Sequence, residues 1–163
     1  MKAGRLAAIA IAAALLVPAT AGAKTVIYGG TIAGGGDMAL TVVASKKGKP
    51  KGIVEIRAAH VPVVCEQSGP QTANTTIPVA IKVKRNSKFS FENIDEFGNR
   101  RFIDGKFSGR KAKNLSGDLQ YGNHFPAEGT LPEEDCTTDV VTYSLKKGAP
   151  DVVVPQRAKP RGI

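Results

Sequence analysis

The sequence predicts an all-β fold, an antiparallel β-sandwich or barrel of about eight short strands with one disulfide. Apolar residues alternate with polar ones at a period of two, and no segment after residue 23 shows the 3.6-residue repeat of an amphipathic helix. Gly, Pro, Asn and Lys interrupt the alternating segments at near-regular intervals. Cys65 and Cys136 are the only cysteines, an even pair that predicts one disulfide in an oxidising compartment.

The alternating segments place the strands in order along the chain. In the first half of the domain they span 25–33, 39–45, 53–57, 61–66 and 79–83. In the second half they span 88–92, 101–107, 115–121 and 139–145. Lys and Gly dominate 46–52, which predicts a turn, and the composition of 67–75 predicts a polar loop. Phe91, Ile94 and Phe97 recur every three residues and can form a single helical turn.

Two of the predicted strands carry a glycine between apolar residues on the same face. Gly105 lies between Ile103 and Phe107, and Gly117 lies between Leu115 and Leu119. A glycine on the inward face of a strand marks a bend or makes room for a large neighbouring side chain. A phosphate-binding loop instead places its glycines between a strand and a helix. The pattern therefore predicts sheet architecture rather than a nucleotide site.

A wider pattern covers residues 77–146 and includes these glycines. It comprises Lys88-Phe89-Ser90, then Gly105-x-Phe107-x-Gly109, then Gly117-x-Leu119, and finally Cys136. The pattern resembles that of small secreted bacterial β-sheet proteins of unknown function, which have a two-cysteine bridge. Their closing strand often carries a Trp, where Tyr143 stands here. The resemblance implies the same β fold, and it implies no catalytic or binding residue.

The N-terminus has the organisation of a secretory signal peptide. Lys2 and Arg5 precede an unbroken apolar run at 6–17, Pro18 ends that run, and small residues at 21–23 form a cleavage site after Ala23. The apolar run is shorter than the ~20 residues that span a bilayer. We therefore predict a secreted, extracellular protein with signal peptide 1–23 and no transmembrane segment in the mature chain.

Composition divides the remaining chain into two parts. Residues 24–148 are the predicted β domain. Residues 149–163 contain three prolines and three cations and predict a flexible basic tail. Signal removal takes away two of the 23 basic residues and none of the 14 acidic ones, which leaves a formal charge of +7.

Basic residues crowd several stretches of the domain, and we expect them to bind anionic groups. The candidate binding residues are Lys82, Lys84, Arg85, Lys88, Arg100, Arg101, Lys106, Arg110, Lys111 and Lys113, and a further turn carries Lys46, Lys47, Lys49 and Lys51. Such a positive field attracts anionic polymers in a salt-dependent manner. The expected partner is an anionic polysaccharide, another cell-envelope polymer or an anionic lipid surface. Nucleic acid is not expected, because the protein is exported and its basic stretches lack interleaved aromatic residues for base stacking.

Acidic residues form one cluster in the sequence. It comprises Glu128, Glu133, Glu134, Asp135 and Asp139. Carboxylates at this density can bind Ca²⁺ or act in general acid–base chemistry. They are equally typical of a solvated loop near the disulfide, and the spacing lacks the Asp-x-Asp-x-Asp-Gly pattern of a calcium loop. The sequence leaves calcium binding open.

No constellation in the sequence points to catalysis. His60 and His124 have no partner at metal-ligand spacing, and no Gly-x-Ser-x-Gly elbow is present. We therefore assign no catalytic residue, metal ligand or cofactor, and expect a non-catalytic binding or structural domain. One alternative is an inhibitor or accessory module that binds another secreted protein through loops 67–75 or 121–135. A second is a small secreted hydrolase, which requires a fold that places either histidine beside the acidic cluster in a cleft.

Overall fold

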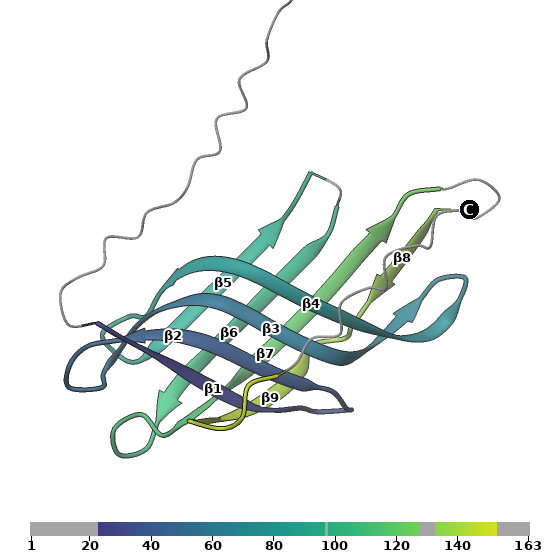
Figure 1. Ribbon diagram of the computed structural model, residues 1–163. Helices are drawn as coiled ribbons and strands as arrows, with labels where there is room; N and C mark the ends of the chain where they lie inside the picture. The colour runs from purple at the N-terminus through teal and green to yellow at the C-terminus, as the bar shows by residue number, and fades with distance from the viewer. Residues whose placement is uncertain (1–22, 97, 128–132, 153–163) are drawn as a thin grey trace, which may run out of the picture.

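The computed structural model describes residues 23–96, 98–127 and 133–152 (Figure 1). Every regular element in these ranges is a strand: β1 (Lys24–Ile32), β2 (Asp37–Ala44), β3 (Pro50–Cys65), β4 (Gly69–Lys82), β5 (Lys88–Ile94), β6 (Arg100–Ser108), β7 (Asn114–Phe125), β8 (Glu134–Thr137) and β9 (Val141–Lys147). Within the described ranges, no helix has the length and apolarity to cross a membrane. Residues 1–22 of the predicted signal peptide, Phe97, Glu128 and residues 153–163 of the predicted tail lie outside the described residues.

The strands form one antiparallel sheet with the order β4-β3-β2-β1-β9-β7-β6-β5. Figure 1 shows this sheet folded over on itself, with β1 to β4 crossing in front of β5, β6, β7 and β9. The β1–β9 pair joins the two layers along one side. The short β8 joins them again because it pairs with both β3 and β7. The predicted all-β, antiparallel fold with one disulfide is confirmed.

The strands near the disulfide are longer than the sequence predicted. The segments expected at 53–57 and 61–66 are parts of the single 16-residue β3. The interruption between them is a shift of register against β4 between Ala58 and Val61. His60 sits at that shift with a φ of 56°. A residue in the left-handed region breaks the alternation of the sequence without ending the strand.

The polar loop predicted at 67–75 is wrong, because most of it belongs to β4. Gly69 pairs with Cys65, so only residues 66–68 make the turn. The Thr-rich, polar composition of β4 suits an edge strand with one solvated face, and pairing with β3 fixes its conformation. The expected 121–135 loop is likewise shorter, since β7 runs to Phe125 and β8 starts at Glu134. The helical turn that the spacing of Phe91 and Ile94 left open is not formed at these two residues, because both belong to β5.

The core confirms the role expected for the inward glycines. Tyr143 of β9 and Phe89 of β5 lie over Gly105 of β6, where an added Cβ would overlap the Tyr143 hydroxyl and come within 2.9 Å of the Phe89 ring. An added Cβ at Gly117 would overlap the Asp104 carbonyl. The two glycines therefore let β6, β7 and an aromatic ring approach closely. The Tyr143 hydroxyl donates a 2.6 Å hydrogen bond to the Asp104 carbonyl, and burial raises the Tyr143 pKa well above its ordinary 10.0.

Candidate functional site

The antiparallel register gathers the basic turns of the sequence at one end of the sandwich. The start of β1 lies beside the end of β2 through the Lys24–Ala44 pair. The start of β3 lies beside the end of β4, and the start of β5 beside the end of β6. The start of β7 lies beside the end of β9 through the Asn114–Lys146 pair. Turns that are far apart in the sequence therefore share one end of the molecule.

We call this region the basic end. Its members are Lys24, Lys46, Lys47, Lys49, Lys51, Lys82, Lys84, Arg85, Lys88, Lys106, Arg110, Lys111, Lys113, Lys146 and Lys147. The segments that carry them, 24–28, 44–52, 82–90, 105–117 and 142–149, contain no Asp or Glu, and Asp104 and Asp118 lie one residue beyond the fourth of these segments. Among the described residues, no ion pair involves a member of the basic end. The basic end is therefore a field of positive charge with no neutralising partner from these segments.

The other described cations differ because each has an anionic partner. The Arg57 guanidinium lies 2.6 Å from the carboxylate of Asp151, which is one of the first residues after the β domain. Arg100 Nη2 lies 3.0 Å from Glu92 Oε1. Arg101 Nη1 lies 3.2 Å from Asp95 Oδ2. Positive charge is thus paired away from the basic end and unpaired at it.

Most of the described acids lie toward the opposite end, which we call the acidic end. Its members are Asp37, Glu66, Glu92, Asp95, Glu96, Glu133, Glu134, Asp135 and Asp139. They occupy the β1–β2, β3–β4 and β5–β6 turns, the termini of the flanking strands, and the segment around β8. The charge of the molecule is therefore polarised along the strand direction.

One cross-strand pair within the basic end places two like charges opposite each other. Lys88 of β5 and Lys106 of β6 are cross-strand partners, and both side chains are exposed. Like charges directly opposite on neighbouring strands destabilise a sheet. The flanking member of the same row, on β7, is Ser116. Asp104 and Asp118 lie in the adjacent row of the same face, and neither forms an ion pair with Lys88 or Lys106.

The structure brings eight of the ten predicted binding residues together. These eight are Lys82, Lys84, Arg85, Lys88, Lys106, Arg110, Lys111 and Lys113. Arg100 and Arg101 lie at the start of β6, beside the acids of the opposite end, and are ion-paired there. Sequence reasoning missed Lys24, Lys146 and Lys147, because only the β1–β2, β1–β9 and β7–β9 pairings place them beside the other turns.

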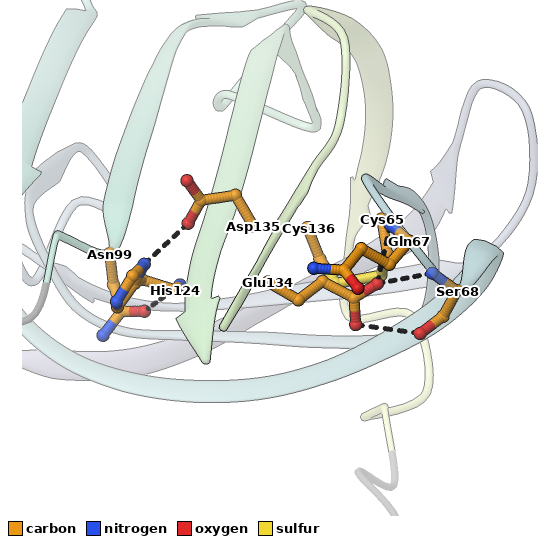
Figure 2. The surroundings of a disulfide bond; sticks show 8 residues. All are labelled: Cys65, Gln67, Ser68, Asn99, His124, Glu134, Asp135 and Cys136. Carbon is orange, nitrogen blue, oxygen red and sulfur yellow. Dashed lines mark hydrogen bonds and ion pairs between the residues drawn. A yellow bond between two sulfur atoms is a disulfide. The ribbon is translucent and has the colours of Figure 1, made fainter. Parts of the chain in front are cut away.

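The disulfide lies among the acids (Figure 2). Cys65 and Cys136 are bonded as predicted and are cross-strand partners on β3 and β8. The Glu134 carboxylate accepts hydrogen bonds from the backbone N–H of Gln67 at 3.0 Å and from that of Ser68 at 2.5 Å. It also accepts one from the Ser68 hydroxyl at 2.9 Å. These bonds, led by those from Ser68, hold the Glu134 pKa below its ordinary value. The Glu134 carboxylate therefore ties the β3–β4 turn to β8 beside the disulfide.

His124 of β7 also lies among these acids. Its Nδ1 is 2.8 Å from Asp135 Oδ1, and its Nε2 is 3.5 Å from Glu133 Oε1. The Asn99 side chain accepts a hydrogen bond from the His124 amide and holds the β5–β6 turn against this site. Asp135 thus occupies the position of an orienting acid, but a carboxylate faces Nε2 where a hydrolase would place its nucleophile. The geometry does not favour hydrolysis at His124.

A cavity lies between the two layers, away from His124. Its volume is about 20 Å³, and its walls include Ile56, Ile77, Phe91, Ile103 and Tyr121. That volume suffices for roughly one water molecule. The cavity is a packing defect of an apolar core rather than a ligand pocket.

Comparison of the chain with protein-family models, curated proteins and solved structures gives no match. The functional argument therefore rests on the residues of this chain and their arrangement.

Proposed function

We propose that the protein is an exported, non-catalytic binding domain that contacts anionic cell-envelope or extracellular polymers through the basic end. The observation that carries this proposal is the contrast in pairing: the described cations outside the basic end have carboxylate partners, and those at the basic end do not. The chain has acidic residues, but they lie elsewhere on its surface and leave the charge of these turns unneutralised. Unneutralised charge at one end favours a site for an anionic partner.

The spread of the charge favours a polymer over a small anion. The cations come from the 45–49, 83–87 and 109–113 turns and from the strand ends beside them. A ligand must extend across several turns to contact them together. Most members are Lys, which acts as a mobile point charge and does not impose the bidentate geometry of Arg. We therefore expect binding through many weak, salt-sensitive contacts.

The exposed apolar residues do not support insertion of this end into a membrane. Val64, Ile94, Phe125 and Val140 are the large apolar side chains exposed in the described part of the chain. They lie in the last residues of β3, β5 and β7 or just before β9, which places them toward the acidic end. Surface-bound proteins that enter lipid combine apolar anchors with basic residues on one face. Here the two features are separated, so a lipid surface is the weaker candidate.

Export is part of the proposal and has separate support. The chain contains the Cys65–Cys136 disulfide. Disulfides persist in oxidising compartments and are rare in proteins of reducing ones. The signal peptide predicted at 1–23 supplies the route. N-terminal sequencing of the exported protein tests this part directly, with Lys24 as the expected first residue.

Co-sedimentation with isolated cell-envelope material tests the binding function. We expect sedimentation at low NaCl that declines smoothly as salt increases, and that weakens strongly in the variant Lys82→Glu/Lys84→Glu/Arg85→Glu. Arg100→Gln serves as the control outside the basic end. Salt-tolerant binding that the triple reversal leaves unchanged would instead favour the accessory module that binds another secreted protein.

A further inference from the structure

Strands β5, β6, β7 and β9 form one layer of the fold (Figure 1), and the outer face of this layer carries exposed polar residues that include three lysines of the basic end. Cross-strand register places Lys88, Lys106, Ser116 and Ser144 in one row over these four strands. The next row toward the basic end contains the Asn114–Lys146 pair. We call these six residues the polar patch.

All six side chains of the polar patch point to solvent. Each is exposed, while the strand neighbours Phe89, Phe107, Leu115 and Leu145 are buried in the core. Neighbouring strands lie about 4.8 Å apart, so the row from Lys88 to Ser144 covers roughly 15 Å. A short stretch of an extended polymer can therefore lie across the four strands.

The chemistry of the polar patch differs from that of the basic turns. Lys82, Lys84 and Arg85 offer charge on mobile side chains around a turn. The polar patch instead places two ammonium groups, on β5 and β6, beside two serine hydroxyls, on β7 and β9, with the Asn114 amide and the Lys146 ammonium in the next row, all on the fixed spacing of a sheet. Ser hydroxyls and the Asn amide both donate and accept hydrogen bonds. Among the described residues, no hydrogen bond occupies the Ser116 or Ser144 hydroxyl.

We propose that the polar patch binds an acidic polysaccharide, with Lys88, Lys106 and Lys146 pairing with its acid groups and Ser116, Ser144 and Asn114 hydrogen-bonding its hydroxyls. This inference rests on the proposed function, because it names the class of polymer that the basic end attracts. A polyphosphate or a lipid headgroup layer needs charge alone and gains little from the hydroxyl and amide positions. A sugar chain presents acid and hydroxyl groups together. Lys88 and Lys106 lie directly opposite each other, so their two ammonium groups can pair with one acid group of the polysaccharide or with two successive acid groups.

Affinity measurements with defined polymers test this inference. The purified protein is titrated by calorimetry with polygalacturonate, with dextran sulfate and with linear polyphosphate, all at one ionic strength. The test variant is Ser116→Leu/Ser144→Leu, which removes two hydroxyls without changing charge. Two hydrogen bonds at about 1 kcal/mol each predict a loss of affinity of about tenfold or more for the sugar polymers. Polyphosphate affinity should stay within about twofold, because its contacts are electrostatic.

A matched variant controls for added apolar surface. Thr72→Leu/Thr76→Leu makes the same kind of change on exposed positions of β4, in the other layer. This control should leave all three affinities unchanged. Circular dichroism and unfolding curves establish that each variant is folded before its affinities are compared.

The outcomes separate this inference from the proposed function. Selective loss of sugar-polymer binding in Ser116→Leu/Ser144→Leu supports the polar patch. Equal loss for all three polymers, or no loss for any, overturns it. If the wild-type protein binds polyphosphate but neither sugar polymer, the polar-patch inference is wrong and the proposed function stands. Binding to none of the three contradicts the proposed function itself.

Discussion

Lys88 and Lys106 lie directly opposite each other on β5 and β6, with both side chains exposed. Cross-strand pairs of opposite charge stabilise a sheet by about 0.2–1 kcal/mol relative to an alanine pair, whereas directly opposed like charges destabilise it. A single carboxylate at either position would relieve this repulsion. A pair of like charges that lowers the stability of the fold is expected where the two residues serve binding instead of stability.

The substitution Lys106→Glu should therefore stabilise the fold and weaken binding together. Placing a carboxylate opposite Lys88 should raise the free energy of unfolding by about 0.5 kcal/mol at low salt, as measured by urea denaturation. High salt should shrink the gain, because both side chains are exposed to screening ions. Lys82→Glu is the control, since its cross-strand partner on β3 is Gly52. A Lys106→Glu protein less stable than wild type would remove the argument that the pair opposes folding.

The Glu134 contacts predict a loss of stability in acid. Hydrogen bonds from Ser68 and Gln67 favour the charged carboxylate, so the pKa of Glu134 is lower in the folded than in the unfolded chain. The stabilisation is complete above the unfolded pKa and disappears as the pH falls through the folded pKa. We expect the free energy of unfolding of Glu134→Gln to fall less than that of wild type between about pH 7 and pH 3. Glu66→Gln, an exposed neighbour, should behave like wild type, and identical pH profiles for all three proteins would contradict the assignment.

The disulfide should contribute strongly to stability and little to binding. Cys65 and Cys136 are 71 residues apart, and closing a loop of that length stabilises by about 4 kcal/mol in the chain-entropy model. The variant Cys65→Ala/Cys136→Ala, or reduction of wild type, should lower the free energy of unfolding by that order in urea. The cystine lies toward the acidic end, so the folded variant should keep its affinity for anionic polymers. Loss of binding in a variant shown to be folded would mean that the acidic end belongs to the binding site.

Gly105 and Tyr143 should be energetically coupled. Gly105→Ala should cost about 1–3 kcal/mol, because its new methyl group meets the Tyr143 hydroxyl and the Phe89 ring. Tyr143→Phe should cost about 1 kcal/mol through the lost hydrogen bond to the Asp104 carbonyl. The double variant should cost less than the sum, since removing the hydroxyl also removes part of the overlap. Strict additivity in the double-mutant cycle would show that the hydroxyl is not what excludes a side chain at position 105.

Much of the fold follows from local pattern, and the errors have one physical cause. Period-two alternation predicted the strands around Ile103 and Leu115 because each buries one face. It failed at residues 69–75 of β4, where pairing with β3 and not burial fixes the strand. It also divided β3 at His60, because a bulge shifts the alternation without ending the hydrogen-bonded ladder.

The sequence predicted which residues carry the charge of the candidate site but not how they are grouped. Clusters of Lys and Arg identified the turns that carry charge, but composition cannot show which turns share an end of the sandwich. Arg100 and Lys106 illustrate the limit, since both belong to β6 and look alike in the sequence. The β5–β6 register pairs Arg100 with Ile94, where its guanidinium reaches the Glu92 carboxylate two residues away, whereas it pairs Lys106 with Lys88. Pairing between strands, which depends on the whole topology, separates the two roles.

The most direct measurement compares Lys106→Gln with Arg100→Gln for binding to one anionic polymer across a NaCl titration. Both variants remove one exposed cation from β6 and have the same net charge, but they lie at opposite ends of the sandwich. If the basic end is the binding site, Lys106→Gln binds more weakly with a shallower salt dependence, and Arg100→Gln binds like wild type. Equal weakening of the two variants would show that net charge alone attracts the polymer, and would contradict a localised site.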